Sequence, residues 1–165
     1  KLAEQKAGFI ASPTDALLLS RDDYLNALLS ICIEPNLGKS NDDSLKPTFL
    51  YAYPPSQASL AKLKCDDSGE LVAERFELYI KGLEIANGYY ELTDAIEQRC
   101  RFDEDNRQRM QLGLPVIPYD ENFLDALVEG MPDCSGVALG IDRLLMIKLK
   151  AKNIEEVVSF PISRA

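Results

Sequence analysis

Two glutamates in the segment 81–91, which reads KGLEIANGYYE, are the residues most suited to chemistry. Glu84 and Glu91 are seven positions apart, an odd number, so on one regular strand they would point to opposite faces. A two-residue turn at Asn87-Gly88 would place them opposite each other, and a bulge there would bring both onto one face. Facing carboxylates repel unless a cation lies between them. The segment therefore predicts a site for Mg²⁺ with nucleotide phosphates, or for an ammonium group, with two solvated glutamates on an edge hairpin as the alternative.

A second candidate is the segment 136–143, which reads GVALGIDR. Glycine weakens a buried strand and often marks the close approach of a ligand or another backbone. Arg143 then falls in the first turn of the following helix, where a guanidinium and the helix N-terminus can bind a phosphate together. The pattern predicts a phosphate site, and the alternative is tight strand–helix packing with Arg143 paired to an acid.

The composition excludes several other chemistries. The 165 residues are 46% hydrophobic and 27% charged, which is typical of one globular domain. The absence of histidine removes Ser-His, Cys-His and His-metal mechanisms. The net charge of −9 disfavours broad binding to a nucleic acid backbone, and no apolar run approaches the ~20 residues of a membrane span. Because the sequence also has no signal-peptide pattern, we expect that this is not a membrane protein.

Four cysteines, at positions 32, 65, 100 and 134, never form a CxxC pair. This spacing fits neither a zinc site nor a redox dithiol. We expect four free thiols in a reducing cytoplasm, with disulfides as the alternative.

The patterning also predicts the elements that must position these residues. Residues 1–45 form a helical lead-in, with a helix start at Ser20 and an end at 34–38. Further on, the pattern predicts a strand at 47–53, β-structure over 73–92, helices at 94–110 and 120–129, a strand at 135–141 and a helix at 142–150. Turns or bulges are expected at 81–82 and 87–88. This order predicts an α+β fold with a mainly antiparallel sheet flanked by helices.

Within the β-rich stretch, apolar and polar residues alternate. Phe76, Leu78 and Ile80 occupy one set of positions. They alternate with Glu77, Tyr79 and Lys81, and this is the strongest β-strand signal in the chain.

Taken together, these motifs resemble the C-terminal half of a class II lysyl-tRNA synthetase catalytic domain. Residues 84–95 read EIANGYYELTDA, and the block 136–143 is similar to motif 3 of that class. Further matches at Pro47-Thr48-Phe49, Pro54 and Ser59-Leu60-Ala61 extend the resemblance over residues 46–165. It implies a class II synthetase-like fold in which this part is one portion of a catalytic domain.

Three segments (56–61, 130–140 and 163–165) are more similar to synthetase paralogs that modify translation elongation factor P. Such enzymes activate lysine, preferably (R)-β-lysine, as an adenylate and attach it to a lysine side chain of elongation factor P instead of tRNA. Tyrosyl and Asp/Asn synthetases fit less well around residues 84–94. The alternatives are a fragment of a lysyl-tRNA synthetase and a non-catalytic paralog acting as an interaction module.

The resemblance implies a nucleotide site. Glu84 matches a ligand of ATP and Mg²⁺, with Ile85 beside the nucleotide. Gly140 matches the backbone position against ATP, and Arg143 the catalytic arginine that grips the triphosphate. Both cofactors, ATP and Mg²⁺, are thereby expected.

The resemblance also implies an amino-acid site. Glu91 matches the carboxylate that contacts the amino acid and shares in binding metal. Asn87 and Tyr89 match positions that line the pocket. Ala138 stands where lysyl-tRNA synthetases usually carry glycine, and its methyl group is expected to shift preference from α-lysine towards a β-amino acid.

Two family motifs have no counterpart here: motif 1, with its dimer-interface helix, and motif 2, with its Phe-Arg-x-Glu. We therefore expect the C-terminal half of an enzyme of roughly twice this length, homodimeric as a whole and inactive as this piece alone. A sheet edge left unpaired in the piece is expected to favour self-association.

Overall fold

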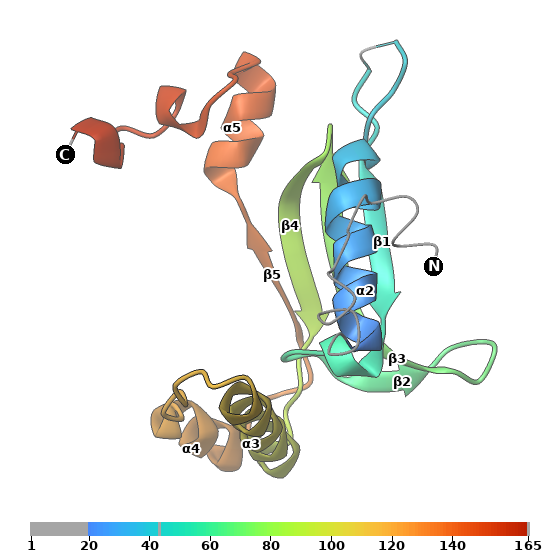
Figure 1. Cartoon of the computed structure of the whole chain (residues 1–165), viewed down its shortest axis with the longest axis vertical. Coiled ribbons are helices and arrows are strands. Elements are labelled where there is room, and N and C mark those ends of the chain that lie inside the picture. The colour runs from blue at the N-terminus through green and yellow to red at the C-terminus, as the bar shows by residue number, and fades with distance from the viewer. Residues whose placement is uncertain (1–19, 43, 165) are drawn as a thin grey trace. The chain divides into compact units, whose positions relative to one another are not determined.

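In the computed structural model, residues 20–42 and 44–164 are described. They form helices and a five-stranded sheet, which confirms the predicted α+β class with an antiparallel sheet (Figure 1). In chain order the main elements are α2 (Arg21–Leu28), β1 (Thr48–Tyr53), β2 (Leu63–Cys65), β3 (Leu71–Ile80), β4 (Leu83–Tyr90), α3 (Ala95–Gln111), α4 (Glu121–Glu129), β5 (Ser135–Leu139) and α5 (Ile141–Leu149). Residues 1–19, the first part of the predicted helical lead-in, lie outside the described residues.

The strand order in the sheet is β1-β3-β4-β5, and β2 pairs antiparallel with β3 through Leu63 and Ala73. β3 and β4 are joined by a turn at Lys81-Gly82, where both residues have positive φ, 53° and 79°. Such a turn suits the twist of the strands that it connects. A turn at Asn87-Gly88 is wrong, because both residues lie within β4 and neither has a positive φ.

By its internal contacts, the chain divides into two compact units. Within the described residues, the first unit comprises 20–50, 76–87 and 138–164, and the second comprises 51–75 and 88–137. β1, β3, β4 and β5 each contribute residues to both units. No helix of the described part is long and apolar enough to cross a membrane.

In the first unit, the loop after α2 packs on the β3–β4 turn. The α2 helix begins at Ser20, which forms a capping box with Asp23. The carbonyl of Gly38 accepts a hydrogen bond from the Lys81 amide at 3.0 Å. Gly38 has φ of +68°, and a Cβ there would lie 2.6 Å from the Tyr79 carbonyl oxygen, so only glycine fits. This loop therefore supports the hairpin formed by β3 and β4.

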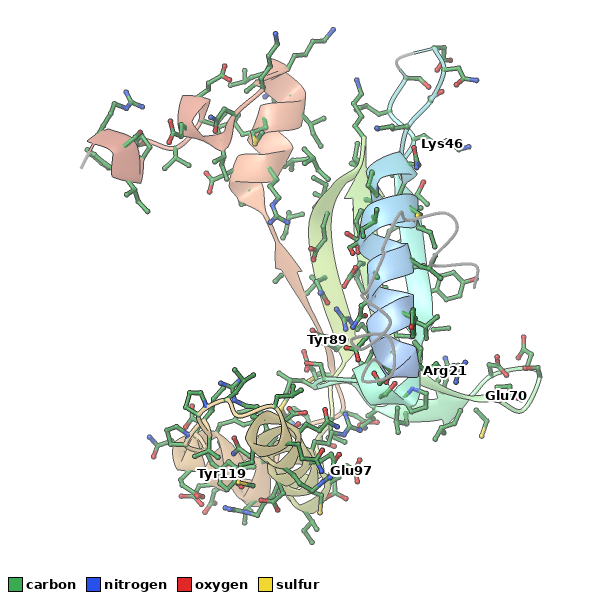
Figure 2. All side chains as sticks on the ribbon, viewed as in Figure 1. Arg21, Lys46, Glu70, Tyr89, Glu97 and Tyr119 are labelled. Carbon is green, nitrogen blue, oxygen red and sulfur yellow. The ribbon has the colours of Figure 1, made fainter. Side chains whose placement is uncertain are left out.

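The second unit contains the helical pair α3 and α4, which lie side by side (Figure 1). Asp94 caps α3 by accepting from two backbone amides, and Asp120 caps α4. Between the helices, the Phe102 and Tyr119 rings stack with centroids 6.1 Å apart. Figure 2 shows Glu97 and Tyr119 among the side chains of this pair and its connecting loop. These local signals account for the helix boundaries that the sequence predicts.

All four cysteines are free thiols. Cys65 and Cys100 are exposed, while Cys32 and Cys134 are half-buried.

Candidate functional site

The face of β3 that carries Glu77 and Tyr79 is buried. Glu77 is 6% exposed and Tyr79 only 2%. A buried carboxylate needs hydrogen-bond partners. The Tyr79 hydroxyl donates to Glu77 Oε2 at 2.6 Å, and Asn87 Nδ2 donates to Glu77 Oε1 at 3.2 Å. Glu77 is thus a candidate site residue in the first unit.

Asn87 connects Glu77 to Glu84. The same Nδ2 group lies 3.5 Å from Glu84 Oε1. Side chains three positions apart point to opposite faces of a regular strand, so this contact shows that β4 departs from regular strand geometry between Glu84 and Asn87. Asn87 thus contacts the carboxylates of Glu77 and Glu84. The sequence predicts instead that Glu84 pairs with Glu91.

The other polar atom of Asn87 is free to bind a ligand. Its Oδ1 is buried and has no hydrogen-bond partner among residues 20–42 and 44–164. A buried acceptor without a partner costs about 1–3 kcal/mol, so such atoms are rare unless a ligand or water supplies the donor. Oδ1 can accept a hydrogen bond from an ammonium group or from another N–H donor.

A strand–helix junction adds a cation to the first unit. Gly140 is the N-cap of α5, and its amide donates to the Ile85 carbonyl at 2.8 Å. Arg143, in the first turn of α5, donates from Nη1 to the Glu84 carbonyl at 2.7 Å. A guanidinium carries five N–H donors, and this one belongs to the first turn of a helix, whose N-terminus favours anions.

Arg143 Nη1 also lies 3.7 Å from Glu84 Oε2. This is the pairing of Arg143 with an acid that the sequence left open as an alternative. The two side chains are 49% and 37% exposed. At this distance and exposure an ion pair contributes little to stability. The guanidinium can therefore take up a phosphate without losing a strong partner.

At Gly140 the protein itself leaves room for a side chain. A Cβ there would meet the Ile85 carbonyl oxygen and the Arg143 Cδ at 3.5 Å, which is ordinary contact. Packing within the described residues therefore gives no reason for glycine. The close approach of a ligand to the Gly140 backbone would explain why this residue is glycine.

Glu91 has its own surroundings in the second unit. Its amide donates to the Cys134 carbonyl at 3.0 Å, and it forms a β-bridge with Ala61. Its carboxylate lies against the backbone of Gly136, where a Cβ would be 2.1 Å from Glu91 Oε1. Any side chain at position 136 would displace this carboxylate.

Tyr89, also in the second unit, lies near a cation. The Arg75 guanidinium is 5.8 Å from the Tyr89 ring centroid and 4.5 Å from that of Tyr53. Arg75 Nη1 also donates to the Gln57 carbonyl at 3.1 Å. Arg75 thereby fixes two aromatic rings to one loop.

The structure thus brings five of the predicted residues together in the first unit, namely Glu84, Ile85, Asn87, Gly140 and Arg143. Tyr89 and Glu91 belong to the second unit. Ala138 is exposed on β5. Sequence reasoning missed Glu77, because an acid in the polar half of an alternating strand is expected to face solvent. The one available signal was its seven-residue spacing from Glu84, the same as from Glu84 to Glu91.

The donor set suits Mg²⁺ in company with phosphates. In the described part of the chain, no group of three or more His, Cys, Asp or Glu side chains could hold a metal ion. Mg²⁺ is commonly bound by one or two carboxylates, with water and substrate phosphates completing the shell. Glu77 and Glu84 fit that pattern.

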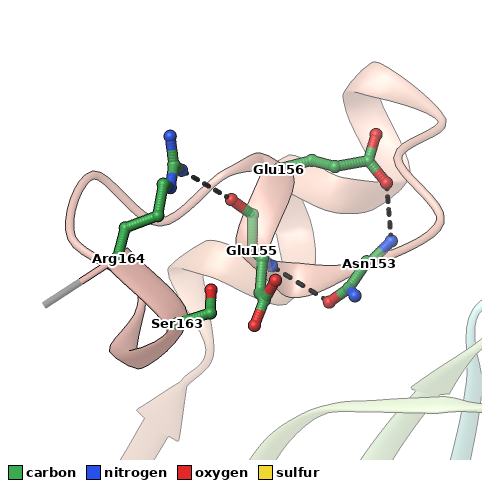
Figure 3. Close-up of a pocket in the computed structure, with 5 residues that line it drawn as sticks. All are labelled: Asn153, Glu155, Glu156, Ser163 and Arg164. Carbon is green, nitrogen blue, oxygen red and sulfur yellow. Dashed lines mark hydrogen bonds between the residues drawn. The ribbon is translucent and has the colours of Figure 1, made fainter.

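One further hollow lies in the C-terminal segment of the first unit and is lined by Asn153, Glu155, Glu156, Ser163 and Arg164 (Figure 3). Its groups bond to one another. Glu156 Oε1 accepts from the Asn153 amide at 2.8 Å, and Arg164 donates to the Glu155 carbonyl at 3.3 Å. These contacts are those of a helix cap and a chain turn, and we assign no site there.

Comparison with known proteins agrees with these features. The family model described as tRNA synthetases class II (D, K and N) matches residues 21–164. Two relatives named elongation factor P--(R)-beta-lysine ligase, from Salmonella gallinarum and Salmonella dublin, are each 54% identical over 145 residues. A third with that name, from Salmonella paratyphi B, is 53% identical. Each alignment covers 88% of this chain and 42% of the relative, so the chain spans about two fifths of their length.

Proposed function

The chain belongs to the class II tRNA synthetase family of the D, K and N type, and on this premise we propose that it is part of an ATP-dependent elongation factor P lysine ligase. The intact enzyme would activate lysine or (R)-β-lysine as an adenylate and transfer it to a lysine side chain of elongation factor P. The name shared by the relatives at 53–54% identity supports the choice of acceptor.

One observation carries the proposal: Asn87 joins the carboxylates of Glu77 and Glu84, while Arg143 bonds to the Glu84 carbonyl. Two acids beside an arginine at a helix N-terminus suit a nucleotide triphosphate with its metal ion. A purely structural role would not explain why the Arg143 guanidinium is exposed while, within the described residues, buried Asn87 Oδ1 has no hydrogen-bond partner.

At the nucleotide, the residues bind and neutralise charge. Bound Mg²⁺ would neutralise phosphate charge. Glu84 and Glu77 would hold it, Arg143 would bind phosphate oxygens, and the Gly140 and Ile85 backbone would lie against the nucleotide. The substrate carboxylate attacks the α-phosphorus in line, an acyl–phosphate bond forms, and pyrophosphate leaves. The acceptor amine then attacks the acyl carbon, an amide forms, and AMP leaves.

At the amino acid, the residues orient a cationic substrate. Glu91 would pair with an ammonium group and contribute to metal binding, as the resemblance implies. Asn87 Oδ1 would accept a hydrogen bond, and Tyr89 would line the pocket. Ala138 would shape the space near the reacting end and favour the β-amino acid.

We propose further that residues 46–165 are the C-terminal half of the catalytic domain, with residues 1–45 as a helical lead-in. On this view the intact protein is a homodimer of the cytoplasm that does not use tRNA, and this piece alone is inactive. A lysyl-tRNA synthetase is the second candidate, because the matching family model includes the K enzymes.

The test is a labelling assay on the intact protein with ATP, Mg²⁺ and labelled lysine or (R)-β-lysine. Elongation factor P and tRNA-Lys compete as acceptors in the same reaction. We expect label on elongation factor P, more with the β isomer. Label on tRNA would identify a lysyl-tRNA synthetase instead, and label on neither acceptor would identify a non-catalytic paralog.

A further inference from the structure

Asp133 is held from two sides within the second unit. It lies in the loop between α4 and β5, and its Oδ1 forms an ion pair with Lys62 Nζ. Its Oδ2 accepts a hydrogen bond from the hydroxyl of Tyr90, the last residue of β4, at 2.5 Å. Lys62 Nζ also lies 4.6 Å from the Tyr90 ring centroid, so the three side chains form a closed cluster.

The cluster is too exposed to matter much for stability. The Asp133 side chain is 65% exposed and that of Lys62 is 25% exposed. Ion pairs at such exposure contribute little to folding. Two charge-assisted contacts in different directions do, however, fix where a carboxylate lies. The geometry therefore points to positioning.

The residues next to Asp133 indicate which group it positions. The next residue, Cys134, accepts the Glu91 amide with its carbonyl at 3.0 Å. Two residues further on, the Gly136 backbone lies directly against the Glu91 carboxylate. Tyr90, the last residue of β4, and Glu91, which follows it, thus contact the consecutive residues Asp133 and Cys134 of one loop. A shift of that loop would move the surface against which the Glu91 carboxylate lies.

We propose that Asp133 is a positioning residue for amino-acid recognition: held by Lys62 and Tyr90, it sets the loop that orients the Glu91 carboxylate towards the substrate ammonium. The inference rests on the proposed function, which takes Glu91 as the group that binds the amino acid. It assigns Asp133 no part in binding ATP.

The test uses two substitutions in the intact protein. Asp133→Leu removes both contacts while keeping the branched shape of the side chain, and Asp133→Asn keeps an acceptor for Tyr90 and the side-chain volume while removing the charge. Asp125→Asn, on the exposed face of α4 in the same unit, is the matched control. In amino-acid-dependent ATP–pyrophosphate exchange, Asp133→Leu should raise the KM for the amino acid about tenfold or more, because small misplacements of a binding group are costly. The KM for ATP should stay unchanged, Asp133→Asn should be intermediate, and Asp125→Asn should match the wild type.

A second readout needs no activity. Half-buried Cys134, next to Asp133, should be alkylated faster in Asp133→Leu, while exposed Cys65 and Cys100 serve as internal references. If Asp133→Leu does not fold, Tyr90→Phe removes one contact by deleting a single oxygen and should change both readouts in the same direction.

Unchanged Cys134 alkylation would overturn the inference, and so would faster alkylation without a change in the amino-acid KM. An equal rise in both KM values would also overturn it, as the sign of a structural role. A wild-type protein without any exchange would instead overturn the proposed function, and the alkylation rates would still decide whether Asp133 holds the loop.

Discussion

Asn87 donates a hydrogen bond to the carboxylate of Glu77, ten residues before it in the sequence, with Nδ2 and Oε1 3.2 Å apart. The same amide reaches Glu84 Oε1 at 3.5 Å, so one asparagine gathers acids from two neighbouring strands. Two carboxylates that share one amide need a hydrogen-bond donor or a cation between them. The Asn87 amide supplies the donor, and we propose that Mg²⁺ bound with ATP supplies the cation.

Glu77→Gln should lower the catalytic efficiency of the intact protein about a hundredfold or more, because it removes a charge that the proposed metal site requires. Exchange measured over a range of Mg²⁺ concentrations should show a higher Mg²⁺ requirement. Glu74→Gln, on the same strand and paired with Lys64 at 2.7 Å, is the control and should leave both values unchanged. A normal Mg²⁺ dependence in Glu77→Gln would contradict the metal role.

Arg143→Ala should reduce kcat/KM for ATP about 100- to 1000-fold, the usual loss when a group that stabilises developing charge is removed. Exchange kinetics at varied ATP concentration measure it. Arg107→Ala provides the comparison, because that arginine pairs with Glu104 on the exposed surface of α3. Equal losses in the two variants would argue against phosphate binding by Arg143.

Gly140→Ala and Gly136→Ala should weaken the binding of different substrates. A Cβ at Gly140 meets its neighbours at 3.5 Å, so stability should hardly change while the KM for ATP rises. A Cβ at Gly136 would lie 2.1 Å from Glu91 Oε1, the end of a flexible side chain that can move aside, so we expect little loss of stability but a higher KM for the amino acid. Denaturant unfolding and exchange kinetics test the pair, and normal ATP binding in Gly140→Ala would count against a ligand there.

Ala138→Gly should shift the ratio of α-lysine to (R)-β-lysine activation towards α-lysine. Removing one methyl group changes discrimination by about 1–3 kcal/mol, or about 10- to 200-fold. Ala138 is exposed on β5, so the change should cost only the ~0.5–1 kcal/mol of stability that glycine costs within a strand. Competition between the two isomers measures the ratio, and an unchanged preference would rule out this residue as the discriminator.

The small contribution of Asp133 to stability should depend on pH at the acid end. The hydrogen bond from Lys62, followed by that from Tyr90, holds the pKa of Asp133 below its ordinary 3.8. A lowered folded-state pKa stabilises the protein above the unfolded value, and that contribution is lost as pH falls through the folded value. The difference in unfolding free energy between wild type and Asp133→Asn should therefore be constant from neutral pH to about 4.5 and shrink below 3.8.

The contribution of the cluster to stability should not change with pH near neutrality. The hydrogen bond to Asp133 raises the pKa of Tyr90 above 10.0 and that of Lys62 above 10.5. Both donors stay protonated at neutral pH, so the cluster persists there. A difference that already varies between pH 6 and about 8 would contradict this assignment.

Short-range signals explain why much of the fold was predictable. Ser20, Asp94 and Asp120 each cap a helix by accepting from amides within three residues. Lys81-Gly82 forms its turn with backbone angles that glycine permits. The position of Arg143 one turn into α5 follows from the strand that precedes it.

Which side of β3 is buried could not be predicted. Alternation shows that a strand has two faces, while the elements packed on each face come from distant parts of the chain. Glu77 is buried because Tyr79 and Asn87 supply its hydrogen bonds, and no pattern within β3 reveals that. Of the turn or bulge expected at Asn87-Gly88, the turn was wrong, because the Lys81-Gly82 turn had already reversed the chain.

By itself, the sequence determined the family, the element order and most of the candidate residues, because caps, turns and motifs depend on neighbours along the chain. Only the tertiary structure decided that Glu77 accompanies Glu84, that the Gly136 backbone lies against the Glu91 carboxylate, and that Asp133 ties its loop to Tyr90. These relationships join residues from different strands and loops. Their distances are set by packing, which spacing along the chain does not encode.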